Sequence, residues 1–332
     1  MSHLLTIAIP TYNRPLDLSR TVGLLIEQLD VQTQLLVLDN CSNEPAETVL
    51  EPFLRKSPER LRIVRNSLNV GVTANIMRCI EFAESPYVWV MSDDDLPTPD
   101  SVSIVHRYIH ETPDCAFWKF SSAQYPFEVE LRASSAEDFL NFVGTMWQAI
   151  WISNGVINRR AVAPHFAIAS HWSSSSSAHM LLILLALEAG YQAIISTKTI
   201  AEHKPPVEEQ KGDLATIYAG FPLLLDAPLQ WRTKQILGRY TRDIFGRPEG
   251  LAIRVTETDD DVWCYAEKVY HYRALGSAIY RCFGNPIQRL KFAVIEQCLA
   301  VIGLAGKLDH RLTGGKIIVR PGLAVPTRRA RM

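Results

Sequence analysis

Apolar runs and helical patterns alternate along the first 120 residues. Short continuous apolar runs are typical of buried strands, and they lie at 4–9, 35–38, 61–64, 87–91 and 115–120. Between the runs, apolar side chains recur at the spacing of one helix face, as at Leu18, Val22, Leu25 and Leu29. Helices are therefore expected after Pro15, a favourable first-turn residue, and at 45–56, 73–84 and 100–110. This alternation predicts an α/β fold with a doubly wound, mostly parallel sheet.

The pattern after residue 120 is looser. We expect helices at 137–151 and 178–189 and strands at 151–158 and 193–196. The run Lys204-Pro205-Pro206 marks a boundary, because proline interrupts both helices and strands. Beyond it, the patterns at 213–245 and 262–308 are mostly helical. The sequence thus predicts an α/β domain at 1–204 and a mainly helical C-terminal region with a basic tail at 205–332.

Polar residues follow four of the expected strands. Open α/β sheets bind ligands at the carboxyl ends of their strands, so these residues are candidates for one shared site. They are Pro10, Thr11, Tyr12, Asn13 and Arg14 after the first strand, Asp39 after the second, Asn69 and Gly71 after the third, and Asp93, Asp94 and Asp95 after the fourth. We expect them to converge on a single ligand, which is more informative than any one motif.

The acidic run Asp93-Asp94-Asp95 has the ligand chemistry of a divalent-cation site. Mg²⁺ and Mn²⁺ prefer carboxylate oxygens and share their remaining positions with phosphates. The alternative is a solvated turn before the helix that begins near Asp100. Asp39 can accept a hydrogen bond from a ribose hydroxyl or a base, or it can be an ordinary turn residue. The glycine fingerprint of dinucleotide-binding folds and the Walker A loop are both absent from the sequence.

Charge is distributed unevenly along the chain. Its 34 Lys and Arg nearly balance 35 Asp and Glu, but residues 281–332 carry a net charge of +8 and residues 1–280 a net charge of −9. A basic tail suggests an anionic partner such as a membrane surface. Apolar residues recur at helical spacing within 287–308, so this segment either lies in a membrane interface or packs on the domain. A second acidic cluster, Asp259-Asp260-Asp261, precedes a helical pattern and is expected to cap it.

Targeting and redox signals are few. The N-terminus is expected to form a first strand rather than a signal peptide, and no apolar run reaches the length of a spanning helix. None of the six cysteines forms a CxxC pair, which is typical of reduced thiols in a cytosolic protein. We therefore expect a cytoplasmic protein, with the C-terminal segment at the inner face of the membrane. No nucleic-acid partner is expected.

The strand-end motifs resemble the family 2 glycosyltransferases, which have the GT-A fold. Residues 7–15, IAIPTYNRP, are similar to that family's opening strand and loop, and 36–42 to its second strand with a nucleoside-binding aspartate. Residues 69–71 with the following Ala74-Asn75 resemble its N-x-G segment, and 87–95 resemble the strand and DxD region. The resemblance is close over about 4–115 and loose over 116–200, and it implies a GT-A-like domain at 1–204 that uses a nucleotide-sugar.

The resemblance also implies a role for each matching residue. Thr11, Tyr12 and Asp39 would hold the nucleoside, Asn69 and Asn75 would line its pocket, and Asp93 and Asp94 would face the ribose and diphosphate. The full set implied for the nucleotide-sugar is Pro10, Thr11, Tyr12, Arg14, Asp39, Asn69, Asn75, Asp93 and Asp94. The implied metal ligands are Asp94 and Asp95, for Mn or Mg. Because Ser92 stands where the family often has a first aspartate, the carboxylate that contacts the metal is not fixed by the motif.

The region expected to carry the catalytic base departs from the family. Members commonly have a Glu-Asp pair there, whereas this chain has no acid between His171 and Glu188. An inverting transfer needs a base that removes the acceptor's proton, and neutral His179 or His171 can do this. The alternative for each is a packing histidine without a catalytic role. Trp147, Trp151 and Trp172 offer stacking faces for a sugar, although core packing is the commoner role of a single tryptophan.

The leading hypothesis is an enzyme that moves a sugar from a nucleotide-diphosphate donor to a glycan or glycolipid hydroxyl, with inversion, in bacterial surface polysaccharide synthesis. A degenerate domain that binds the nucleotide-sugar or glycan without turnover is the non-enzymatic alternative, favoured by the missing acidic pair. A sugar nucleotidyltransferase is the other enzymatic alternative. Such enzymes usually carry a glycine-rich loop with a basic residue after the first strand, which is absent here.

Overall fold

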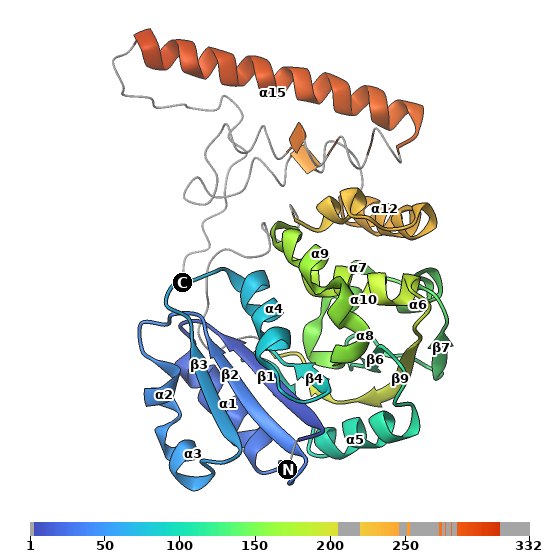
Figure 1. The fold of residues 1–332 in the computed structure, drawn as a ribbon. Coiled ribbons are helices and arrows are strands. Elements are labelled where there is room, and N and C mark those ends of the chain that lie inside the picture. The colour runs from blue at the N-terminus through green and yellow to red at the C-terminus, as the bar shows by residue number, and fades with distance from the viewer. Residues whose placement is uncertain are drawn as a thin grey trace, which may run out of the picture. The chain divides into compact units, whose positions relative to one another are not determined.

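The structure, a computed structural model, contains an eight-stranded sheet (Figure 1). It describes residues 3–204, 220–245, 251–252, 272–273, 276, 280 and 284–312. The strand order is β3-β2-β1-β4-β8-β6-β9-β7. The strands are β1 (Leu5–Thr11), β2 (Thr33–Asp39), β3 (Leu61–Arg65), β4 (Tyr87–Val90), β6 (Phe117–Ser121), β7 (Leu131–Ala133), β8 (Gly155–Asn158) and β9 (Ala193–Thr199).

The sheet is mixed, with parallel pairing in the half that carries the candidate residues. Strands β3, β2, β1 and β4 pair in parallel with one another, and β6 pairs in parallel with β9. Strand β8 lies antiparallel between β4 and β6, and β7 is antiparallel to β9. The register places Thr11 beside Asp39, so the first two strands end at the same level. This edge is where a ligand of an open α/β sheet is expected.

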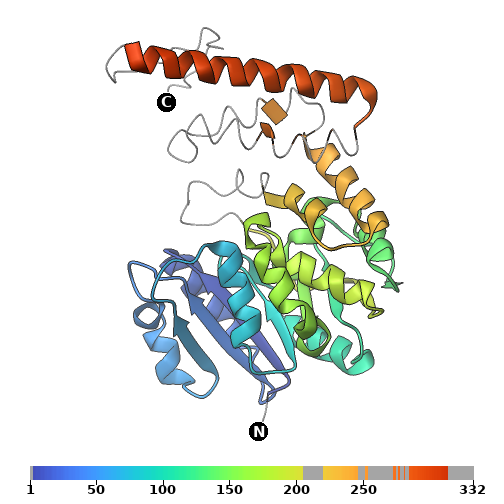
Figure 2. The same ribbon diagram turned by 45° about the horizontal axis from the view of Figure 1, so that its top comes forward.

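Helices cover both faces of the sheet. Helices α1 (Pro15–Ile26) and α5 (Ser101–Glu111) bury Leu18, Val22, Leu25, Val105 and Ile109 in one core cluster with strands β1, β2 and β4. Helix α4 (Val72–Phe82) contacts β1 and β2 as well as α10 (Ala178–Glu188) on the opposite face, as Figure 2 shows for α4 in cyan. The other helices are α2 (Ala46–Val49), α3 (Glu51–Lys56), α6 (Ala136–Val143), α7 (Met146–Ile150), α8 (Arg159–Val162), α9 (Phe166–His171), α12 (Trp231–Phe245) and α15 (Pro286–Leu312).

Two predicted helices are broken, and one predicted strand is shorter than expected. The helix predicted at 45–56 divides into α2 and α3 around Leu50, with Pro52 in the first turn of α3. The helix predicted at 137–151 ends at Gly144, which has a left-handed backbone with φ +81°, and α7 then starts after a Thr145 cap. The strand predicted at 151–158 is limited to β8, because residues 152–154 form a 3-10 turn.

A separate two-stranded sheet brings distant parts of the chain together. It pairs β5 (Leu96–Pro97), directly after the acidic run, with β10 (Ala201–Glu202). The strands are antiparallel, with Glu202 opposite Leu96. As a result, residue 203 lies next to residue 95, although 108 positions separate them in the sequence.

The chain divides into two compact units, Met1–Ile244 and Phe245–Met332. The first continues past the predicted boundary at residue 204, because Glu188 accepts hydrogen bonds from the Gln230 amide and the Thr233 hydroxyl at the start of α12. Tyr240 on the same helix donates to the Leu140 carbonyl. The second unit contains α15, and no helix among the described residues is long and apolar enough to cross a membrane. The predicted cap at Asp259-Asp260-Asp261 and the tail beyond 312 lie outside the described residues.

Candidate functional site

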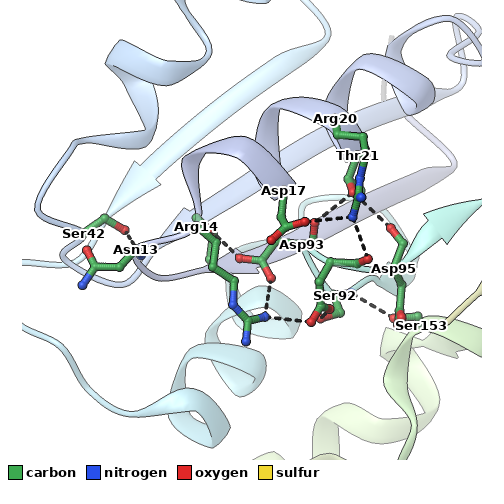
Figure 3. A network of polar contacts seen from close by, with 12 residues as sticks. Asn13, Arg14, Asp17, Arg20, Thr21, Ser42, Ser92, Asp93, Asp95 and Ser153 are labelled. Atoms are coloured by element: carbon green, nitrogen blue, oxygen red, sulfur yellow. Dashed lines mark hydrogen bonds and ion pairs between the residues drawn. The ribbon is translucent and has the colours of Figure 1, made fainter. Parts of the chain in front are cut away.

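The ends of β1 and β4 meet in a network of charged and polar side chains (Figure 3). The Thr11 hydroxyl donates to Asp93 Oδ2 at 2.7 Å. Arg14, just before α1, donates through Nη1 to Asp93 Oδ1 at 3.1 Å and to Asp94 Oδ2 at 2.9 Å. The predicted convergence of the first and fourth strand ends is therefore present in the structure.

Asp94 is the most accessible carboxylate of the acidic run. Its side chain is 14% exposed, against 4% for Asp93 and 2% for Asp95. The Ser92 hydroxyl donates to Asp94 Oδ1, and Arg14 occupies Oδ2. Of the three side chains, Asp94 is thus the one placed to meet a ligand from solvent.

Helix α1 and the 3-10 turn at 152–154 fix the backbone of the acidic run. The Thr21 hydroxyl lies 2.8 Å from the Asp93 carbonyl and 3.0 Å from the Asp95 carbonyl. Arg20 donates to the Asp94 carbonyl at 3.1 Å, and the Ser153 hydroxyl accepts from the Ser92 amide at 2.9 Å. These contacts hold the run in a turn that brings the Asp93 and Asp94 carboxylates to Arg14 and the Asp95 carboxylate to other partners.

Asp95 is held by two aromatic residues that the sequence did not connect to it. Trp151 donates from Nε1 to Asp95 Oδ2 at 2.7 Å, and His203 Nδ1 lies 3.1 Å from Oδ1. Trp151 is itself fixed through its carbonyl, which accepts from the buried Lys119 ammonium at 2.7 Å. His203 was missed because its position depends on the pairing of β5 with β10, for which two-residue strands give no periodic signal.

Burial and neighbouring charges perturb the acidic run. Burial, with a smaller contribution from the Asp94 carboxylate, raises the pKa of Asp93 to about 7 against the opposing effects of Arg14 and Thr11. Burial also raises the pKa of Asp95, against hydrogen bonds from Ser153, Trp151 and His203. Carboxylates whose ionised forms are poorly compensated favour a bound cation.

Asp39 is fully buried beneath the loop that follows β2. Its Oδ1 accepts from the Ser42 amide at 2.8 Å and its Oδ2 from the Ala46 amide at 3.1 Å. Arg65, at the end of β3, also donates to Oδ2. Burial acts to raise the pKa of Asp39, but these hydrogen bonds outweigh it and lower the pKa below its usual value. In this structure Asp39 holds the loop after β2 through these hydrogen bonds. A contact with a nucleoside would be a second role of Asp39.

Asparagines join the ends of β2 and β3 to the start of α4. Asn40 donates to Asn69 Oδ1 at 2.7 Å, and Asn66 donates to Asn75 Oδ1 at 2.8 Å. Gly71, at φ +84°, occupies a backbone region that side chains disfavour, just before α4 begins. The two predicted asparagines, Asn69 and Asn75, therefore belong to one network, in which Asn75 is buried. Pro10 and Tyr12, at the end of β1, are half-buried.

The two histidines predicted as bases are not joined to the acidic run. His179 is only 6% exposed, its Nε2 lies 2.9 Å from the Ile150 carbonyl, and burial lowers its pKa to about 4. It lines an internal void of about 10 Å³ together with apolar side chains such as Ile183. His171 is exposed at the end of α9. The placement of His179 supports the packing alternative better than a role in proton transfer.

The donor set around Arg14 is compatible with a cation. Among the described residues, no group of three or more His, Cys, Asp or Glu side chains is already arranged to hold a metal ion. Asp93 and Asp94 nevertheless both contact Nη1 of the Arg14 guanidinium, so their carboxylates already converge on one positive charge. Carboxylate oxygens and the imidazole of His203 are ligand types that Mn²⁺ accepts.

Residues 6–158 match the model of glycosyl transferase family 2. They form a domain of that family. Similar proteins include the abequosyltransferase RfbV of Salmonella typhimurium, 26% identical over 113 residues, which are 33% of this chain and 34% of RfbV. The putative teichuronic acid biosynthesis glycosyltransferase TuaG of Bacillus subtilis is 25% identical over 114 residues, 34% of this chain and 44% of TuaG. The chain thus spans between a third and a half of these two relatives, and the predicted family is confirmed.

The solved structure of S. aureus TarS 1–349 in complex with UDP has the same fold. It superposes with a TM-score of 0.60 at 13% identity and covers 96% of this chain and 95% of that one. The complex of TarS 1–349 with UDP-GlcNAc gives 0.59 at 14% identity, with coverages of 84% and 82%. The predicted GT-A-like fold is therefore confirmed.

Proposed function

We propose that the chain transfers a sugar from a nucleotide-diphosphate donor to a glycan or glycolipid hydroxyl, with inversion, in bacterial surface polysaccharide synthesis. The observation that carries the proposal is the acidic run at the meeting point of the strand ends, where Asp94 alone has appreciable exposure. The similarity to the abequosyltransferase RfbV and to the putative teichuronic acid biosynthesis glycosyltransferase TuaG supports the class of reaction.

In this proposal the chain binds the donor along the strand ends. Pro10, Thr11, Tyr12 and Asp39 hold the nucleoside, and the asparagine network with Asn69 and Asn75 shapes that pocket. Asp93 and Arg14 face the diphosphate. Asp94 and Asp95, with His203 beside Asp95, would hold Mn or Mg. The metal would supply positive charge to the departing diphosphate.

The direct test is a thermal-shift screen of nucleoside diphosphates and nucleotide-sugars with and without Mn²⁺, followed by donor hydrolysis assays. We expect one nucleotide to raise the melting temperature more with Mn²⁺ than with EDTA, because a ligand of the native state stabilises it. Binding together with hydrolysis supports the enzyme. Binding without turnover for any acceptor supports the degenerate domain, which the burial of His179 favours. No shift with any nucleotide would contradict both.

The histidines give a matched pair of substitutions. His203→Ala removes the imidazole beside Asp95, so Mn²⁺-dependent nucleotide binding should weaken about tenfold at unchanged stability, as for loss of one ligand-shell partner. His179→Ala removes a buried ring and should lower the free energy of unfolding by about 2 kcal/mol. Calorimetry and urea denaturation measure the two effects. Complete loss of turnover in folded His179→Ala, with donor binding intact, would instead support His179 as the base.

We also propose peripheral membrane contact through the C-terminal region. On α15, the apolar side chains of Ile287, Leu290, Val294 and Val301 are 54–67% exposed, and their spacing places them on one helix face. The surrounding segment is basic, with a net charge of +8 over 281–332. Apolar side chains beside basic residues are typical of helices in an anionic interface. The predicted location at the inner face of the membrane depends on this contact.

Vesicle sedimentation tests the contact. The full chain should sediment with phosphatidylglycerol vesicles and much less with phosphatidylcholine vesicles, and high salt should weaken binding. Val294→Asp should reduce sedimentation several-fold, whereas Val31→Asp, at a valine 73% exposed outside α15, should not. A chain that stays in the supernatant with both lipids would exclude this contact.

A further inference from the structure

The Arg14 guanidinium contacts both carboxylates that face the proposed diphosphate and metal (Figure 3). One nitrogen, Nη1, donates to both, at 3.1 Å to Asp93 Oδ1 and at 2.9 Å to Asp94 Oδ2. The Arg14 side chain is 20% exposed, so these ion pairs are largely shielded from solvent. Arg14 therefore supplies the positive charge that a bound cation would otherwise give to this pair of acids.

The geometry of the Arg14 ion pairs is that of an exchangeable contact and not of a bidentate arginine–carboxylate pair. Strong arginine–carboxylate pairs use two nitrogens in a fork, whereas here one nitrogen serves two carboxylates. Arg14 Nε is buried and has no hydrogen-bond partner among the described residues. Leaving a buried donor unpaired is costly, so part of the hydrogen-bonding capacity of this side chain is unused in the present state.

We propose that Arg14 is an internal counter-ion that leaves Asp94 when a divalent cation binds there and then donates to the donor diphosphate. The inference rests on the proposed function, which it deepens by assigning Arg14 two successive partners. Asp94 Oδ2 is bound to Arg14 in this structure, so a cation and the guanidinium compete for the same oxygen. The released guanidinium remains at the start of α1, where its planar set of donors can bind two oxygens of one phosphate group.

Competition between Arg14 and the cation predicts opposite changes in two affinities, the affinity for Mn²⁺ alone and the affinity for UDP with Mn²⁺. Removal of the Arg14 charge should strengthen the binding of Mn²⁺ alone, because a competing positive charge is lost at close range. The same removal should weaken UDP binding at saturating Mn²⁺, because a charge-assisted contact with phosphate is lost. A merely structural arginine would change both affinities in the same direction.

The experiment compares Arg14→Met, which keeps the aliphatic stem, with Arg14→Lys, which keeps the charge. By calorimetry on the full chain, we expect Arg14→Met to bind Mn²⁺ alone about tenfold more tightly than wild type and UDP with Mn²⁺ about tenfold more weakly. Arg14→Lys should stay within about threefold of wild type for Mn²⁺ alone. The Mn²⁺-induced rise in melting temperature should also be larger for Arg14→Met than for wild type. If Arg14→Met does not fold, the same measurements are made on Arg14→Gln, a second neutral variant.

The outcomes separate the inference from the function on which it rests. If the wild-type chain binds UDP with Mn²⁺ and the neutral variants bind Mn²⁺ alone no more tightly than wild type, the exchange is wrong and the proposed function stands. If the wild-type chain binds no Mn²⁺ with any of the nucleoside diphosphates of the thermal-shift screen, both are overturned. Opposite changes in the two affinities, seen in the neutral variants but not in Arg14→Lys, support the exchange.

Discussion

Asp94→Ala should abolish metal-dependent donor binding. Asp94 is the most exposed carboxylate of the acidic run and contacts both Ser92 and Arg14, so its loss removes the proposed metal ligand with little effect on the core. We expect calorimetric affinity for UDP with Mn²⁺ to fall at least about 100-fold, or about 3 kcal/mol. Affinity for UDP in EDTA should change little, because the nucleoside contacts remain.

Asp100→Ala is the matched control for this substitution. Asp100 is exposed, lies six residues further along the chain and makes no side-chain cap of α5. Its replacement should leave Mn²⁺-dependent binding within about twofold, as is usual for surface positions without a specific role. A titration of Asp94→Ala with Mn²⁺ and UDP that matches wild type would remove Asp94 from the metal site.

Asp39→Ala should be the most destabilising of the carboxylate substitutions. It leaves the Ser42 and Ala46 amides without their acceptor, and each buried donor left unpaired costs about 1–3 kcal/mol. The half-exposed Arg65 partner adds little. We expect the free energy of unfolding in urea to fall by about 3 kcal/mol, with nucleotide binding reduced because the loop after β2 loses its anchor.

The effect of Asp39→Ala should depend on pH. Its pKa is lower in the folded protein than the usual value, so the carboxylate stabilises the fold above its unfolded pKa of about 4, and this contribution disappears as pH falls through the folded pKa. The difference from wild type should therefore be full at pH 7 and shrink below about pH 4. Asp114→Ala, at an exposed aspartate, should show almost no difference at either pH. An Asp39→Ala urea midpoint equal to wild type would mean that other contacts hold the loop.

The sequence predicted the parallel half of the sheet and its polar edge because both produce patterns in short stretches of consecutive residues. The strands before Thr11, Asp39 and Asp93 are continuous apolar runs of the expected length, and their order in the chain fixes which ends meet. The antiparallel insertion of β8 was not predicted, since a four-residue apolar segment carries no information about its direction. The break at Gly144 was also missed, because one glycine within an otherwise helical pattern is weak evidence for a cap.

The site was predicted where it depends on single loops and missed where it depends on distant pairing. Thr11 ends β1, and Arg14 and Asp94 lie in the short loops just after β1 and β4. His203 and Trp151 reach Asp95 only through tertiary contacts across 108 and 56 positions. His179 was chosen for its position in the chain, and the strongly apolar helix around it explains why the structure buries it. A histidine on a helix whose neighbours are all apolar is better explained by packing.

The pairing of β5 with β10 sets the order in which the site can be completed during synthesis. Every other residue of the acidic-run network precedes residue 154, whereas His203 follows β10. A nascent chain can form the strand ends long before it carries the imidazole. Comparison of shortened chains that end before Ala201 or after Lys204 should therefore separate a unit that binds nucleotide from one that also retains the metal. The match to the family model ends at residue 158, so comparisons confined to that region omit the histidine altogether.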